Sequence, residues 1–160
     1  MQPGKEIGET IAERLRATIG VAIGPSEWFL VDQQRVDAFA TAIDAHDAIH
    51  TDPAKAAASR FGGTIAPGFY IAGLMPKLLR QVFRPEGAGP GMAYGMEKLR
   101  FPSVVRCGRR VRLSGQLQKV EAAGPAAIAS IDLAVEIEGD EKPACVGTLL
   151  MRYTGVRSDG

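Results

Sequence analysis

The feature that most constrains the fold is a segment that is apolar around nearly its whole circumference when it is drawn as a helix. It runs from Gly68 to Phe83, and its large apolar side chains cover more than one helical face: Phe69, Ile71, Leu74, Met75, Leu78, Leu79, Val82 and Phe83. Such a helix is stable when other elements bury it on most sides. Pro76 lies inside it and removes one backbone hydrogen bond, which predicts a kink rather than an end. The rest of the chain must supply the layer that covers this helix.

Long strands are predicted after the helix, at residues 92–101, 109–122, 126–138 and 144–153. Apolar and polar residues alternate along the two middle segments, and the alternation slips near Lys119, which predicts a β-bulge. Consecutive strands with short connections favour an antiparallel sheet with one apolar face. The economical arrangement is an α+β domain in which this sheet wraps around the apolar helix.

The first part of the chain is expected to form a helix and a lead-in to the sheet. Within residues 5–18 apolar side chains recur every four positions, which predicts a surface helix with one buried stripe. A short apolar run at 28–31 is of strand type. The whole of residues 1–160 is expected to be a single domain, with 1–27 as its N-terminal helix and lead-in.

Capping residues predict two further helices. Asp32 is a favourable N-cap for a helix over about 33–43, in which apolar residues recur at helical spacing. Asp52, followed by a proline, is typical of the start of a short helix that ends near residue 59. Residues 45–51, between the two helices, are predicted to be a loop.

Charge and composition exclude several classes of function. The chain has a formal net charge of +1, which gives no reason to expect nucleic acid or an anionic membrane surface as a partner. No stretch approaches the roughly 18 uninterrupted apolar residues of a membrane span, and the N-terminus has no apolar run typical of a signal peptide. Cys107 and Cys145 are expected to be free thiols in a reducing compartment, which favours the cytoplasm.

Candidate chemistry is concentrated just before the apolar helix. The only two histidines, His46 and His50, lie there, and the carboxylates Asp44 and Asp47 stand among or beside them. Gly68 then begins the helix, whose N-terminus offers unpaired N–H groups, and a glycine lets a ligand approach closely. Imidazole, carboxylate and helix N-terminus together suit acid–base chemistry on a carbonyl compound.

Three motifs resemble those of the MaoC-like dehydratases and their NodN-like relatives, which are related to (R)-specific enoyl-CoA hydratases. They read I-H-T-D-P at 49–53, F-G-G-T-I-A-P-G-F at 61–69 and Y-G-M-E-K-L-R-F-P at 94–102, and the resemblance extends from about Trp28 to Tyr153. It implies the hotdog fold and the hydration of an enoyl thioester, or the reverse dehydration. It also implies a coenzyme A or acyl-carrier thioester as substrate, no further cofactor, and a homodimer or dimer of dimers.

The same resemblance assigns roles to individual residues. In the family, a motif G-D-x-N/Q-x-x-H supplies an aspartate and a histidine that hold the water, and a glycine at the start of the central helix donates its N–H to the thioester carbonyl. The histidine corresponds to His50, the glycine to Gly68, and the residue three before the histidine to Asp47. Ala45 stands at the position of the family's aspartate, so Asp47 is the predicted carboxylate partner of His50 and Asp44 is the second choice.

Several alternatives stay open at this point. The missing aspartate, together with Pro67 where the family often has histidine, fits a non-catalytic protein that binds acyl thioesters. Hydrolysis of an acyl-CoA on the same fold is a third interpretation. A zinc site of His46, His50 and Asp47 would need a helix to bring the histidines together, and the segment is predicted to be a loop, so no metal is expected. Arginines between residues 106 and 112 are interpreted as a charged sheet face rather than as ligands of coenzyme A phosphates.

Overall fold

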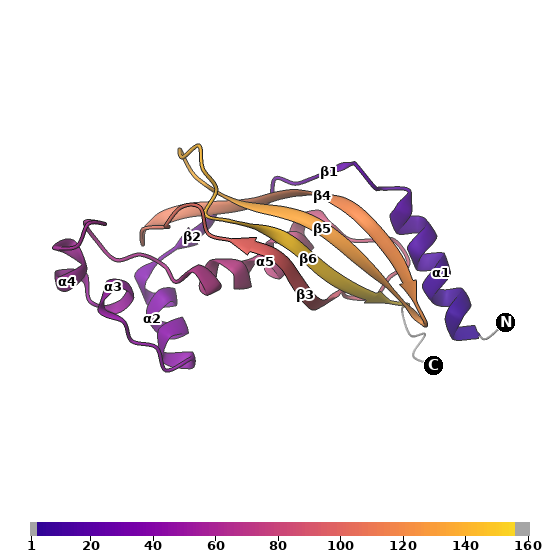
Figure 1. Cartoon of the computed structure of the whole chain (residues 1–160), viewed down its shortest axis with the longest axis horizontal. Coiled ribbons are helices and arrows are strands. Elements are labelled where there is room, and N and C mark those ends of the chain that lie inside the picture. The colour runs from indigo at the N-terminus through magenta and orange to yellow at the C-terminus, as the bar shows by residue number, and fades with distance from the viewer. Residues whose placement is uncertain (1–2, 156–160) are drawn as a thin grey trace.

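The computed structural model describes residues 3–155, and a six-stranded antiparallel sheet forms its upper layer. The strand order is β1-β4-β5-β6-β3, and β2 also pairs with β4. The strands are β1 (Ala22–Ile23), β2 (Phe29–Val31), β3 (Met92–Arg100), β4 (Arg109–Ala123), β5 (Ala126–Ile137) and β6 (Cys145–Thr154). The sheet arches over helix α5 (Gly68–Val82), as Figure 1 shows. This arrangement confirms the expected α+β hotdog architecture.

The central helix α5 is buried as its sequence predicts. Met75 and Leu78 have no exposed surface, and Ile71 is 2% exposed. These side chains belong to one apolar core with the inner faces of β4, β5 and β6. Burying a side chain of this size contributes about 1.5–3 kcal/mol, so α5 and the sheet stabilise each other. Pro76 lies inside the helix, as expected.

The register between β4 and β5 decides which residues face α5. Val111, Leu113 and Leu117 lie on one face of β4 and are fully buried, whereas Arg112, Ser114 and Gln116 lie on the opposite face and are only partly buried. The pairing shifts between Leu117 and Lys119, which confirms the predicted bulge. After the shift the buried series resumes at Val120, which is 7% exposed.

Helix α1 (Pro3–Arg16) packs against β4 and β5 at the end of the sheet opposite α2, α3 and α4 (Figure 1). Ile11 and Leu15 are 3% and 1% exposed and share the core that contains α5. The N-terminal helix is therefore part of the same domain. Strand β1 was not predicted, because two residues carry no periodic signal; it pairs Ile23 with Gly115 on β4.

Helices α2 (Gln33–Ala42), α3 (Ala48–Thr51) and α4 (Pro53–Ala57) form a group at one end of the molecule (Figure 1). Asp32 caps α2 by accepting a hydrogen bond from the backbone N–H of Arg35 at 2.9 Å, as predicted. The predicted loop at 45–51 is wrong in its second half, where Ala48–Thr51 form the single turn α3. Between residues 3 and 155, no helix has the length and apolar character needed to cross a membrane.

Candidate active site

His50 lies on α3 and is partly buried, with its ring held by one hydrogen bond. Its Nδ1 is 2.7 Å from the backbone oxygen of Ile65. A carbonyl oxygen can only accept a hydrogen bond, so Nδ1 carries hydrogen, and in the neutral ring Nε2 presents a lone pair. In this tautomer Nε2 is the ring nitrogen that can accept a hydrogen bond or a proton.

Gln33, the first residue of α2, makes side-chain hydrogen bonds to the two backbone segments that position this histidine. Its Nε2 donates to the backbone oxygen of His50 at 2.7 Å and to Oδ1 of Asp37 at 2.8 Å. Its Oε1 accepts a hydrogen bond from the hydroxyl of Thr64, which is 8% exposed. Thr64 directly precedes Ile65, the residue that binds the ring. One amide thus connects the two segments whose relative position fixes the imidazole.

A backbone contact ties the same two segments together. The N–H of Ile65 donates to the oxygen of Ile49 at 3.1 Å. His50 is therefore held through its ring, through its own carbonyl and through the neighbouring residue. This is the kind of support that keeps a reactive side chain in one orientation.

The N-terminus of α5 lies next along the chain from Ile65. Pro67 occupies the N-cap position, and no side chain caps the first N–H groups of the helix. A Cβ on Gly68 would lie 3.0 Å from Cγ of the Phe101 ring. A side chain at Gly68 would therefore crowd the Phe101 ring, which is itself 41% exposed. Donation from the backbone N–H of Gly68 to a thioester carbonyl remains a prediction.

The carboxylates lie near His50 in sequence but make no hydrogen bond to its ring in the part of the chain that the structure describes. Asp44 is exposed and has a left-handed backbone with φ of 53°. Asp47 is exposed at the N-cap position of α3, where its side chain makes no capping hydrogen bond. Asp52 instead caps α4, as predicted, by accepting from the N–H of Lys55 at 3.1 Å, and this bond lowers the pKa of Asp52.

His46 is exposed, and its neighbour Ala45 is partly buried. Among residues 3–155, no group of three or more histidine, cysteine, aspartate or glutamate side chains is placed to hold a metal ion. His46 and His50 are therefore not joined with Asp47 into a three-residue ligand set.

Three polar residues near this site, Gln33, Thr64 and Tyr70, were not predicted from the sequence to belong to it. The hydroxyl of Thr64 donates a hydrogen bond to the side-chain oxygen of Gln33, 31 residues away in the sequence. No local sequence pattern predicts such a contact. Tyr70, in the first turn of α5, packs edge-on against Phe39 with ring centroids 5.5 Å apart. Its hydroxyl is buried without a hydrogen-bond partner among the described residues, and burial raises its pKa. A buried unpaired hydroxyl is rare and marks a position where a ligand group would be bound favourably.

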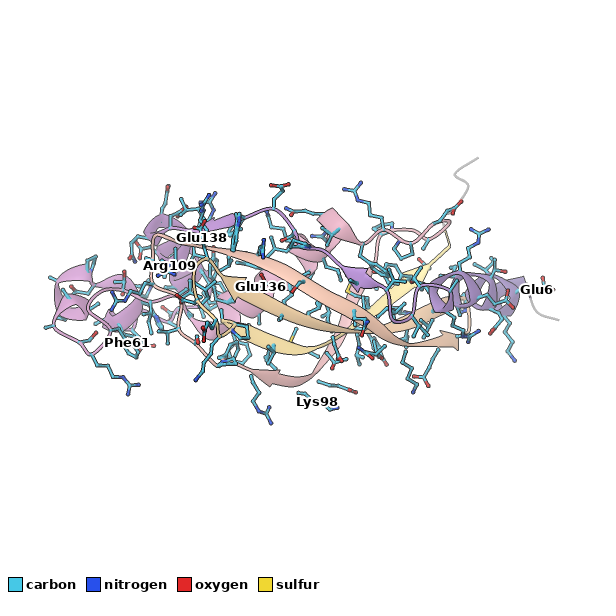
Figure 2. The ribbon with its side chains drawn as sticks, turned by 90° about the horizontal axis from the view of Figure 1, so that it is seen from above. Glu6, Phe61, Lys98, Arg109, Glu136 and Glu138 are labelled. Carbon is cyan, nitrogen blue, oxygen red and sulfur yellow. The ribbon has the colours of Figure 1, made fainter. Side chains whose placement is uncertain are left out.

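Arginines of β4 make ion pairs with the neighbouring strand β5 and the turn that follows it. Arg112 pairs with Glu136 at 2.7 Å, Arg110 pairs with Glu138, and Arg109 pairs with Asp140 at 2.9 Å. Figure 2 shows Arg109, Glu136 and Glu138 together at the end of the sheet near α2–α4. These three arginines form the charged sheet face that the sequence predicted.

A sequence model of a protein family described as "MaoC like domain" matches residues 6–131. The chain is 41% identical over 146 residues to 3-hydroxyacyl-thioester dehydratase Z of Mycobacterium tuberculosis (strain ATCC 25618 / H37Rv), covering 91% of this chain and 96% of that protein. It is 38% identical over 136 residues to nodulation protein N of Rhizobium leguminosarum bv. viciae, covering 79% and 80% of the two chains.

Solved structures are similar to the fold. The MaoC-like dehydratase from Rhodospirillum rubrum superposes with a TM-score of 0.69 and 21% identity, covering 86% of this chain and 93% of that one. An (R)-hydratase from A. caviae superposes with a TM-score of 0.68 and 23% identity, covering 83% and 94%. These likenesses establish that both proteins share the sheet-around-helix architecture.

Proposed function

The chain belongs to the MaoC-like domain family, and from this premise we propose that it is an (R)-specific-type enoyl-CoA hydratase or 3-hydroxyacyl-thioester dehydratase. The observation that carries the proposal is His50, whose Nδ1 binds the backbone oxygen of Ile65 at 2.7 Å and whose Nε2 is left as a base. The substrate is a thioester of coenzyme A or of an acyl carrier, and the reaction needs no further cofactor.

In the hydration direction, Nε2 of His50 takes a proton from water while the water oxygen bonds to C3 of the enoyl thioester. The electrons of the C2–C3 double bond shift to the thioester oxygen, which becomes an enolate. Backbone N–H groups at the start of α5, that of Gly68 first, stabilise this charge, because preorganised donors lose nothing to reorganisation. The imidazolium returns its proton to C2, and the enolate electrons re-form the thioester carbonyl.

Asp47 is proposed as the carboxylate that orients the water, with Asp44 as the second choice. Asp47 supports this assignment because its side chain is free of a capping bond and stands at the first turn of the helix that carries His50. Ala45, at the position of the family's aspartate, is the observation that favours the alternative, a thioester-binding protein without catalysis.

Two assays on the purified protein test this function. Hydration of crotonyl-CoA, followed by loss of the enoyl absorbance, is the expected activity. Release of free thiol from an acyl-CoA instead would identify a thioesterase. Saturable binding of crotonyl-CoA with neither activity would identify a binding protein and would overturn the hydratase assignment.

The cellular setting follows from the same proposal. Cys107 and Cys145 are both free thiols, which supports a cytoplasmic location, where thiols stay reduced. Residues 1–160 are proposed to act as one domain, and a second copy of the chain is its proposed partner. Neither nucleic acid nor membrane is needed for the reaction.

A further inference from the structure

A cavity of about 300 Å³ lies at the C-terminal end of α5, a size within the range of small-molecule sites. It is open to solvent on one side and bounded by the last turn of the helix, the segment that leads to β3, and the end of β6. The lining residues are Leu79, Arg80, Phe83, Arg84, Pro85, Ala88, Gly89, Pro90, Gly91, Met151 and Tyr153.

The walls of this cavity are mainly apolar. Leu79 and Met151 come from the buried core and are each 1% exposed. Phe83 packs edge-on against Tyr153 with ring centroids 6.3 Å apart. A Cβ on Gly91 would lie 2.5 Å from Cε1 of Tyr153, so the glycine is what lets the backbone close over the ring. The hollow suits a hydrocarbon chain.

The charged groups that line the cavity are both guanidiniums. Arg80 and Arg84 are exposed and linked, since Nε of Arg84 donates to the backbone oxygen of Arg80 at 2.9 Å. Between residues 3 and 155 neither guanidinium is paired with a carboxylate, and no acidic residue lines the cavity. Two free guanidiniums beside an apolar hollow are complementary to a carboxylate.

Tyr153 adds a third donor. The residue is 3% exposed, and its hydroxyl has no hydrogen bond to another residue in the described range 3–155. Burial raises the pKa of Tyr153 to about 12, so the hydroxyl keeps its proton. Tyr153 lines the cavity, so its hydroxyl can donate to an acceptor that a bound ligand supplies.

This cavity is separate from the candidate active site. Gly68 and Leu79 are 11 residues apart on α5, which corresponds to about 16 Å along the helix. Figure 1 shows α3, which carries His50, at one end of the molecule, and α1 at the other. A molecule bound at Tyr153 would therefore not occupy the site at His50.

We propose that this cavity binds a medium-chain fatty acid as the free carboxylate. The chain lies against Leu79 and Met151, and the carboxylate accepts hydrogen bonds from Arg80 and Arg84. At about 30 Å³ for a group of the size of water, the cavity holds roughly ten heavy atoms, which matches the ten carbon atoms of decanoate when its two oxygens lie outside, at the exposed guanidiniums. The site is independent of the catalytic role of His50.

Calorimetric titration of the full-length protein with decanoate, below its micelle concentration, tests this site. One molecule is expected to bind per chain. Decyltrimethylammonium has the same chain with a cationic head and is expected not to bind. The double variant Arg80→Gln/Arg84→Gln should weaken decanoate binding at least about tenfold, as the loss of charge-assisted hydrogen bonds implies. Lys77→Gln, an exposed cation on the same helix outside the cavity, should change nothing.

Two further measurements locate the bound decanoate. In protein labelled with ¹³C at the methionine methyl groups, decanoate should shift the signal of Met151. His50→Ala should leave decanoate affinity unchanged, so that this result and the crotonyl-CoA assay can fail separately. Three outcomes would overturn the proposal: binding of decyltrimethylammonium as tight as that of decanoate, a weaker affinity for decanoate in His50→Ala, or no binding of decanoate to the natural protein.

Discussion

At the scale of single residues, the proposed chemistry depends on His50 more than on any other side chain. We expect His50→Ala to lower the rate of crotonyl-CoA hydration by roughly 10²–10⁴, the usual contribution of a general acid–base residue. The thermal midpoint should hardly change, because the ring is partly exposed and makes one hydrogen bond. His46→Ala is the matched control, since His46 is exposed, and it should keep full activity. Unchanged turnover per folded molecule in His50→Ala would return this histidine to a structural role.

Gln33 is expected to act as a positioning residue through its bonds to His50 and Thr64. Gln33→Ala removes the connection between the two segments that hold the imidazole, and small displacements of a reactive group can cost up to about 10² in rate. We therefore expect kcat to fall by roughly tenfold to a hundredfold with little change in KM. Thr64→Ser keeps the hydroxyl and should keep activity, whereas Thr64→Val should resemble Gln33→Ala. The ¹⁵N signals of His50 report whether the proton stays on Nδ1. A loss of stability with normal kcat and an unchanged tautomer would contradict the positioning role.

The choice of carboxylate can be tested at Asp47 and Ala45. If Asp47 orients the water, Asp47→Asn should reduce hydration, and Ala45→Asp should add little to the natural activity. Ala45 adjoins a loop and is only partly buried, so the substitution should change stability by no more than about 0.5 kcal/mol. Activity that appears only in Ala45→Asp would show that the natural chain is a binding protein. Activity lost in Asp44→Asn but kept in Asp47→Asn would identify Asp44 as the working carboxylate.

Local sequence patterns predicted some residues of the candidate site and not others, for a physical reason. The N-caps Asp32 and Asp52 were predicted because a cap is decided within four residues. The contact between Gln33 and Thr64 was not, because tertiary packing brings these two residues together. The ring of Phe101 near Gly68 is likewise a tertiary contact, which no local pattern predicts.

At the scale of elements, the apolar periodicity of the sequence predicted the helix and strands that pack into the core. Helix α5 and the long strands of the sheet carry many residues in a repeating apolar pattern, so their positions were predicted to within one or two residues. Strand β1 and helix α3 have two and four residues, too few for a period. They form because β4 offers an edge to β1 and because α3 packs against α2 and α4.

Replacing each of two glycines on α5 with alanine should change the free energy of unfolding in opposite directions. Gly68→Ala places a Cβ 3.0 Å from the Phe101 ring and should destabilise the fold by about 1–3 kcal/mol, as overpacking does. Gly73→Ala meets nothing within 4 Å and should stabilise it by about 0.4–1 kcal/mol, because alanine loses less backbone entropy. Denaturant unfolding measures both. Adding Phe101→Ala to Gly68→Ala should recover part of the loss if the ring is the cause.

At the scale of the whole molecule, β3 is a long edge strand that has no strand on its outer side among residues 3–155. Strand β3 pairs with β6 on one side and ends the sheet on the other. Met92 and Tyr94 on this strand are 61% and 63% exposed. At its C-terminal end, Phe101 contacts Phe69, which is 70% exposed, with ring centroids 5.6 Å apart. An open strand edge continued by exposed aromatic rings favours pairing with another chain.

We therefore expect the protein to be a homodimer, or a dimer of dimers, that pairs through β3. Light scattering at micromolar concentration should give at least twice the mass of the chain. Tyr94→Lys places a charge from each copy at the pairing edge, where like charges destabilise association, and should weaken the dimer at least about tenfold. Val21→Lys is the matched control, because Val21 is 58% exposed and lies just before β1, at the other end of the strand order. This control should leave the mass unchanged. Because Phe101 packs over Gly68 at the start of α5, loss of the dimer should also reduce hydration activity. A natural chain that is a stable monomer and is active would exclude both the β3 interface and its support of the catalytic site.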